Sequence, residues 1–183
     1  MDLPKTDSRL ETKLGFDRIR RDIQDRCATD YAAARVAAET FCTDPSEIRH
    51  RLILADEMRL ILMFEENFPS SGYIDALPFL ELLCEEGSNI DTMNLGKLKT
   101  LTDTSRKICA FFSSVKDEVY PNLKRMSAPI RCYPEVTRRI ESILDRYGEI
   151  KDSASDELFS IRRNRRDLEA SLSKKAAAIL KRA

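Results

Sequence analysis

Apolar residues recur at helical spacing along most of the chain, and this pattern predicts a series of amphipathic helices. Side chains three or four positions apart share one face of a helix, so such spacing marks the face that packs. The spacing predicts helices over residues 14–23, 31–42, 45–67, 92–120 and 135–147. We therefore predict an all-α fold, a helical bundle with one long projecting helix at its C-terminal end.

Two of these helices carry the widest apolar stripes, and we expect them to be packed along their length. The stripe of residues 45–67 consists of Ile48, Leu52, Ala55, Met58 and Leu62, widened by Leu54, Ile61 and Phe64. The stripe of residues 92–120 consists of Leu98, Leu101, Ser105, Ile108, Phe112, Val115 and Val119. Asp44 followed by Pro45 also predicts a firm helix start, because Asp caps a helix and Pro suits its first position.

The C-terminal segment has a narrower apolar stripe than the helices before it. Ser153 or Ser155 can cap a helix here. The stripe consists of Leu158, Ile161, Leu168, Leu172 and Ile179. A stripe this narrow suits contact with a single partner helix. No Gly or Pro ends the pattern, so we expect the helix to continue beyond residue 183.

We accordingly divide the chain into three parts. Residues 1–9 are predicted to be a flexible N-terminus, residues 10–154 a helical core domain, and residues 155–183 the beginning of the projecting helix. Composition supports helices throughout, since Gly and Pro together make only 12 of 183 residues and turns must be few.

Charge is distributed unevenly, although the whole chain has a net charge of zero. Residues 155–183 hold eight Lys and Arg against four Asp and Glu. The basic side chains of this segment that are candidates for contact with nucleic acid are Arg162, Arg163, Arg165, Arg166, Lys174 and Lys175. Two interpretations stay open: a solvated helix whose arginines pair with Asp167 and Glu169, or a helix whose arginines contact the phosphate backbone.

The chain offers little catalytic chemistry. Gly96-Lys97 is the only Gly-Lys pair, but Asp91 and Leu98 stand where a phosphate-binding loop needs Gly and Ser or Thr. His50 is the single histidine, and we expect it to be a solvated helix residue. We predict no catalytic residue, no metal site and no cofactor within this segment.

The five cysteines do not suggest a disulfide framework or a CxxC pair, and a reducing cytoplasm is the expected location. No apolar run reaches the roughly 18 residues needed to cross a bilayer, and we expect no membrane partner.

Three stretches together resemble a known family. They are LETKLGFDRIRRDIQDRCATDYAAARV, LILADEMRLILMFEENFPSSGYIDALPFL and GEIKDSASDELFSIRRNRRDLEASL. They look like the N-terminal region of the type-two branch of the MutS family, from about Leu10 onward. The most specific part runs from Asp152 to Arg163.

The resemblance implies a function for the whole protein. It also implies that this segment carries out none of the protein's catalysis. It implies a homodimeric, DNA-binding ATPase that acts on branched or duplex DNA in recombination control or repair, often with a C-terminal nuclease domain. Some members are implicated in splitting stalled ribosomes. ATP, magnesium and the dimer contact belong to parts of the family beyond this segment. This segment would be the helical core and the start of a lever helix that couples the ATPase to a DNA clamp.

A different class of function remains open. The chain can instead be a helical adaptor that binds a protein partner through the stripe formed by Leu158, Ile161, Leu168 and Leu172. Sequence downstream of residue 183 would distinguish the two hypotheses, because only the first requires a phosphate-binding loop there.

Overall fold

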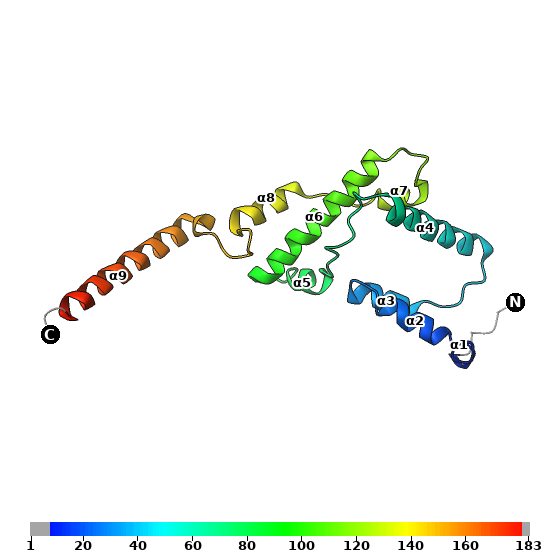
Figure 1. Ribbon diagram of the computed structural model, residues 1–183, viewed down its shortest axis with the longest axis horizontal. Coiled ribbons are helices and arrows are strands. Elements are labelled where there is room, and N and C mark those ends of the chain that lie inside the picture. The colour runs from blue at the N-terminus through cyan, green and yellow to red at the C-terminus, as the bar shows by residue number, and fades with distance from the viewer. Residues whose placement is uncertain (1–7, 181–183) are drawn as a thin grey trace.

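The computed structural model describes residues 8–180, and the regular elements within them are helices (Figure 1). These elements are α1 (Ser8–Leu14), α2 (Phe16–Gln24), α3 (Asp30–Ala38), α4 (Pro45–Phe64), α5 (Leu77–Leu82), α6 (Thr92–Ser114), α7 (Pro121–Ser127), α8 (Pro134–Ile143), the short 3-10 helix η1 (Asp152–Ala154) and α9 (Asp156–Leu180). The all-α prediction is confirmed. The flexible N-terminus predicted for residues 1–9 lies mostly outside the described residues.

Polar caps fix the starts of three helices. The Thr29 side chain accepts a hydrogen bond from the Ala32 N–H, and the Asp44 side chain accepts one from the Ser46 N–H. Asp91 accepts one from the Asn94 N–H at 2.7 Å. Each bond satisfies a backbone donor that the first turn of a helix leaves unpaired. The predicted starts of α3, α4 and α6 are therefore confirmed to within a residue.

The helix predicted over residues 92–120 is shorter than expected. It ends at Ser114, because Val115 has an extended backbone and Pro121 begins the separate helix α7. A residue before proline is disfavoured in the helical conformation, which separates the two helices at Tyr120. Lys124 Nζ donates to the Val115 carbonyl at 2.6 Å and so satisfies an acceptor at the end of α6.

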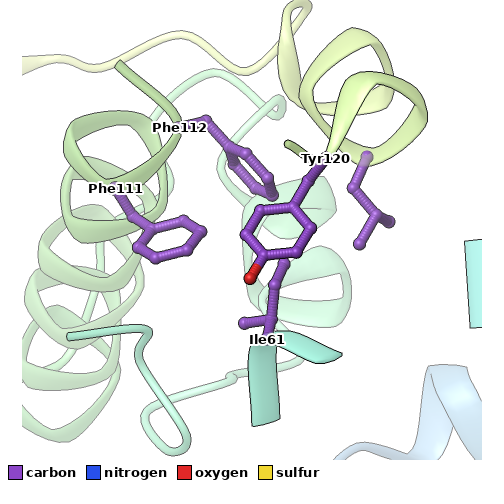
Figure 2. Packing of buried hydrophobic residues seen from close by; sticks show 5 residues of the cluster. Ile61, Phe111, Phe112 and Tyr120 are labelled. Atoms are coloured by element: carbon purple, nitrogen blue, oxygen red, sulfur yellow. The ribbon is translucent and has the colours of Figure 1, made fainter. Parts of the chain in front are cut away.

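A cluster of buried side chains joins α4, α6 and α7. Its most buried members are Ile61, Phe111, Phe112, Tyr120 and Leu123. Figure 2 shows the rings of Phe111, Phe112 and Tyr120 gathered beside Ile61. The Phe111 and Phe112 rings meet edge to face with centroids 5.1 Å apart, a preferred aromatic geometry. The prediction that Phe112 lies in the core is confirmed.

Glu57 is a buried carboxylate that joins α4 to α7. Its side chain is the acceptor for the Leu123 N–H at 2.8 Å and for both the backbone N–H and the side-chain amide of Asn122. These donors lie in the first turn of α7, where backbone N–H groups lack partners within the helix. The α4 side chain therefore takes the part of a capping residue for α7.

The buried face of α4 differs from the predicted stripe. Leu52 and Leu62 are 65% and 64% exposed, whereas Glu57 and Ile61 are buried. Ile61, Leu54 and Met58 of the predicted stripe do pack in the core. Leu52 and Leu62 lie outside the face that Glu57 directs toward α7. The helix is therefore less buried than its composition suggested.

The first three helices form a separate small unit below α4 in Figure 1. Arg20 on α2 holds this unit together, because its guanidinium donates to the Val36 and Glu39 carbonyls and to the Glu11 carboxylate at 3.0 Å. Apolar side chains of this unit remain largely exposed: Leu14, Phe16, Ile19, Ile23 and Tyr31.

The chain passes from the core to its last helix through α8. Thr137 on α8 bonds to Thr102 on α6 through their hydroxyl groups at 3.1 Å. A tight turn follows, in which Asp145 Oδ1 accepts from the Tyr147 and Glu149 N–H groups and Gly148 has a φ of 82°. Only glycine adopts this φ without strain. The turn reverses the chain into η1 and α9.

Helix α9 projects away from the rest of the molecule (Figure 1). It has 25 residues, which at 1.5 Å per residue corresponds to about 37 Å. Over the side chains that the structure describes from residue 163 onward, every residue is exposed. The predicted long projecting helix is confirmed.

Candidate functional site

The base of α9 contains the basic residues that the sequence singled out. Ser155 caps the helix, since its hydroxyl accepts from the Leu158 N–H at 3.2 Å. Asp156 and Glu157 occupy the first turn, where negative side chains interact favourably with the positive end of the helix dipole. Of the two candidate caps, Ser155 is the one the structure uses.

Asp152 in η1 anchors α9 through two arginines. Arg162 Nη1 donates to Asp152 Oδ1 at 2.6 Å and to the Ile150 carbonyl at 3.0 Å. Arg166 Nη2 donates to the other carboxylate oxygen of Asp152. Arg162 and Arg166 lie one turn apart and so share the face of α9 that looks toward η1. The carboxylate fixes the direction in which the helix leaves the core.

These arginines also change the ionisation of Asp152. The hydrogen bond from Arg162 lowers the pKa of the Asp152 carboxyl below its usual value, and the positive charges of Arg166 and Arg162 lower it further. The carboxylate is therefore ionised throughout the neutral range. Asp152 is consequently the negative partner of two of the four arginines in the run.

A shallow hollow of about 330 Å³ lies at this junction and is lined by Asp152, Arg162, Arg165 and Arg166. Arg165 pairs with Glu169 at 3.1 Å, one turn further along α9. The sequence interpretation that placed partners at Asp167 and Glu169 is right for Glu169. Asp167 forms no ion pair within residues 8–180, and Asp152 is the second acidic partner instead.

The remaining basic candidates extend along the outer part of α9. Arg163, Lys174 and Lys175 are exposed. None of the three forms an ion pair with a residue that the structure describes. Their charges face solvent and suit long-range attraction to a polyanion, and their role in nucleic-acid binding stays a prediction.

The apolar stripe of α9 is open along most of its length. Leu158 is half-buried near the base, while Ile161, Leu168 and Leu172 are 56%, 65% and 65% exposed. Ile179 lies outside the described side chains. An apolar row on an otherwise charged helix suits contact with another helix.

The sequence motif closest to a nucleotide-binding loop and the single histidine both lie in helices. The described residues contain no group of three or more His, Cys, Asp or Glu that could hold a metal, and no helix within residues 8–180 is long and apolar enough to span a membrane. Gly96 lies inside α6, so its backbone N–H belongs to a helix and cannot cradle a phosphate as a loop does. His50 is exposed on α4, as predicted.

Sequence reasoning did not identify the anchoring role of Asp152. The residue belongs to the stretch that carries the family resemblance, but its partners lie 10 and 14 positions away across a turn. Asp152 is one of three acids in the ten residues before the arginine run, the others being Asp156 and Glu157. Local spacing does not show which of the three acids meets the arginines.

In comparisons with known proteins, the chain matches several relatives that share one name. The chain is 24% identical over 170 residues to "Endonuclease MutS2" of Geobacillus kaustophilus, covering 92% of this chain and 22% of the relative. It is 25% identical over 178 residues to the protein of the same name from Symbiobacterium thermophilum, covering 96% and 22%. The protein of that name from Leuconostoc mesenteroides is 26% identical over 153 residues, covering 81% and 19%.

The chain thus spans about a fifth of the length of the curated relatives that it matches. No family model matches it. The matches nonetheless extend over most of the chain and agree in name. The resemblance to the type-two branch of the MutS family is therefore confirmed, and the chain is similar to part of a MutS2-type protein.

Proposed function

We propose that this chain is the helical core and lever segment of a MutS-like DNA-binding ATPase that acts in recombination control or DNA repair. In this role it catalyses no reaction itself. It holds α9 in a fixed direction, so that movement of an ATPase elsewhere in the protein reaches a DNA clamp. The observation that carries the proposal is the projection of α9 from a base fixed by Asp152.

The form of α9 supports a mechanical role. A single helix of 25 residues transmits displacement along its axis, because each turn is hydrogen-bonded to the next. The bonds of Asp152 to Arg162 and Arg166 resist rotation of the helix at its base. The contacts of η1 and α8 then connect that base to α6 and the core.

The open surface of the molecule also supports the proposal. Its accessible surface is 14974 Å², whereas a compact folded protein of 21.0 kDa has about 9000 Å². Apolar side chains on α2, α4 and α9 contribute to the excess. A segment that packs against further parts of a larger protein is expected to expose such faces.

A helix-breaking substitution in the full-length protein tests the proposal. Ser171 is exposed in the middle of α9, and Ser171→Pro removes a backbone donor and costs about 3 kcal/mol of helix stability. We expect ATP hydrolysis without DNA to persist and its stimulation by branched DNA to be lost. The matched control, Ser171→Ala, should keep both. Stimulation that survives the proline would show that α9 does not couple the two sites.

The proposal assigns ATP, magnesium, nuclease activity and the homodimer contact to the remainder of the protein. No step of the reaction is assigned to the segment described here. A cytoplasmic location follows from the same proposal. A ribosome as a second target stays a prediction of the resemblance.

A second function is favoured by the exposure of Ile161, Leu168 and Leu172. In this alternative the chain is an adaptor whose α9 stripe binds a helix of another protein. Replacing Leu168 and Leu172 by Ser would then abolish capture of the partner helix. If α9 is a lever, the same change in the full-length protein should instead lower DNA-stimulated ATP hydrolysis.

A further inference from the structure

A cysteine of α6 lies against a connector that contains a second cysteine. Cys109 is on α6, and Cys132 lies in the connector between α7 and α8. The Cys109 thiol donates to the Ile130 carbonyl with Sγ and O 3.7 Å apart, and Ile130 is two residues before Cys132. The connector therefore runs directly past the Cys109 sulfur.

The environment of the two thiols differs. Cys109 is half-buried, and Cys132 is exposed. Burial raises the pKa of the Cys109 thiol, and a side-chain hydrogen bond to Cys132 together with the charge of Cys132 raises it further. The geometry that brings them near is the bond of Cys109 to the Ile130 carbonyl, two residues before Cys132 in the connector.

The connector is held in position from both sides. Pro129 and Pro134 flank it and restrict its backbone. The Ile130 N–H donates to the Ser127 carbonyl at 2.9 Å at one end, and Thr137 on α8 bonds to α6 at the other. The Cys109 sulfur thus lies against a connector that the fold holds in place and that contains Cys132.

We propose that Cys109 and Cys132 form a redox modification site, which a peroxide oxidises to an intramolecular disulfide that fastens the α7–α8 connector to α6. All five cysteines are free thiols in the structure described here, which is the reduced form of this site. The proposal is independent of the proposed function.

The chemistry balances with one peroxide molecule. The exposed Cys132 sulfur attacks a peroxide oxygen, so an S–O bond forms, the O–O bond breaks and water leaves. The Cys109 sulfur then attacks the resulting sulfenic acid. The S–S bond forms, the S–O bond breaks, and the departing hydroxide takes the Cys109 proton to give a second water. The two thiols are oxidised and the peroxide is reduced to two waters.

The disulfide would restrain the path that leads to α9. It closes the loop from Cys109 to Cys132, which removes conformations from the unfolded chain. It also ties the segment before α8 to the same helix that α8 already contacts. Oxidation is therefore expected to raise the stability of the α6–α8 junction.

The test is controlled oxidation of the purified chain with hydrogen peroxide. Peptide mapping without reductant should give a linked peptide that contains Cys109 and Cys132 and that disappears on addition of dithiothreitol. The melting temperature should rise by about 5 °C or more and return on reduction. Cys132→Ser, at an exposed position, should lose both effects, while the control Cys84→Ser should keep them.

Three outcomes would overturn the proposal. They are a Cys132 that links to another cysteine or to a second chain, a Cys132 that advances to sulfinic acid with Cys109 still reduced, and a Cys109–Cys132 bond that leaves the melting temperature unchanged. The last would show that the bond forms only in a distorted state.

Discussion

Single carboxylates join elements of this molecule that sequence order does not bring together. Glu57 on α4 accepts three hydrogen bonds from the start of α7, and Asp152 in η1 accepts from two arginines of α9. A carboxylate that accepts bonds from several donors holds them strongly. Removing that carboxylate leaves each donor unpaired, which costs free energy. Each of the two junctions therefore depends on a single carboxylate of its own.

The burial of Phe112 in the core predicts a large loss of stability when its side chain is removed. Phe112 is 6% exposed in the cluster of Figure 2, so we expect Phe112→Ala to lower the free energy of unfolding by roughly 3 to 5 kcal/mol. Urea denaturation measures this loss. Val119→Ala is the control, because Val119 belongs to the same predicted stripe but is 47% exposed. A melting temperature that shifts by no more than a degree in Phe112→Ala would contradict the assignment.

At the scale of elements, the sequence predicts where helices begin better than which face they bury. The caps at Asp44 and Asp91 are local, since the bonded donors lie within three residues, and spacing alone reveals them. The buried face of α4 depends on Glu57 and its partners 65 and 66 positions away. No local pattern contains that information.

At the candidate site, too, local features could be predicted from the sequence and contacts between elements could not. The sequence predicted the basic run and the apolar stripe of α9 because both repeat along one helix. It did not predict that Asp152 would pair with Arg162 and Arg166, because that depends on how the extended backbone at Ser155 directs α9 relative to η1. It also gave no sign that Cys109 lies against the connector that contains Cys132, since that contact requires α7 to fold first.

The anchor of α9 makes a prediction about pH. Arg162 and Arg166 lower the pKa of Asp152 in the folded chain, so their contribution to stability is fully present above the unfolded pKa of about 4. It is lost as the pH falls through the lowered pKa. We expect Asp152→Asn to speed hydrogen exchange in the first turns of α9 near pH 7.

The pH series supplies the check on this prediction. The difference between Asp152→Asn and the unchanged chain should shrink as the pH falls below about 4. Asp167→Asn is the matched control, since Asp167 lies on α9 without an ion pair among residues 8–180. Equal exchange in all three proteins at neutral pH would mean that Asp152 does not hold the helix.

At the scale of the whole molecule, the distinctive property is an open shape. The small core of α4, α6 and α7 lies at some distance from α9, and the unit of α1 to α3 lies apart from both (Figure 1). A single enveloping core would leave less apolar surface at α2, α4 and α9. This form is suited to a segment that holds other parts in position.

The same arrangement predicts weak DNA binding by this chain alone. Arg162 and Arg166 are paired with Asp152, which leaves few open cations. Gel shifts at low salt should show weak binding to linear and branched duplexes alike. Replacing Lys174 and Lys175 by Gln should reduce the slope of log affinity against log salt by about 2, whereas Ser173→Gln should leave it unchanged. Tight, branch-selective binding would contradict this assignment.

A lever role for α9 requires most directly that the helix extends from the core in solution. Small-angle X-ray scattering on the monomeric chain measures this through the radius of gyration. A compact protein of 183 residues has a radius of about 16 Å and an unfolded one about 46 Å. We predict a value well between the two, with a distance distribution that tails toward long distances. A radius near 16 Å with a symmetric distribution would show that α9 folds back onto the core, and would contradict the account.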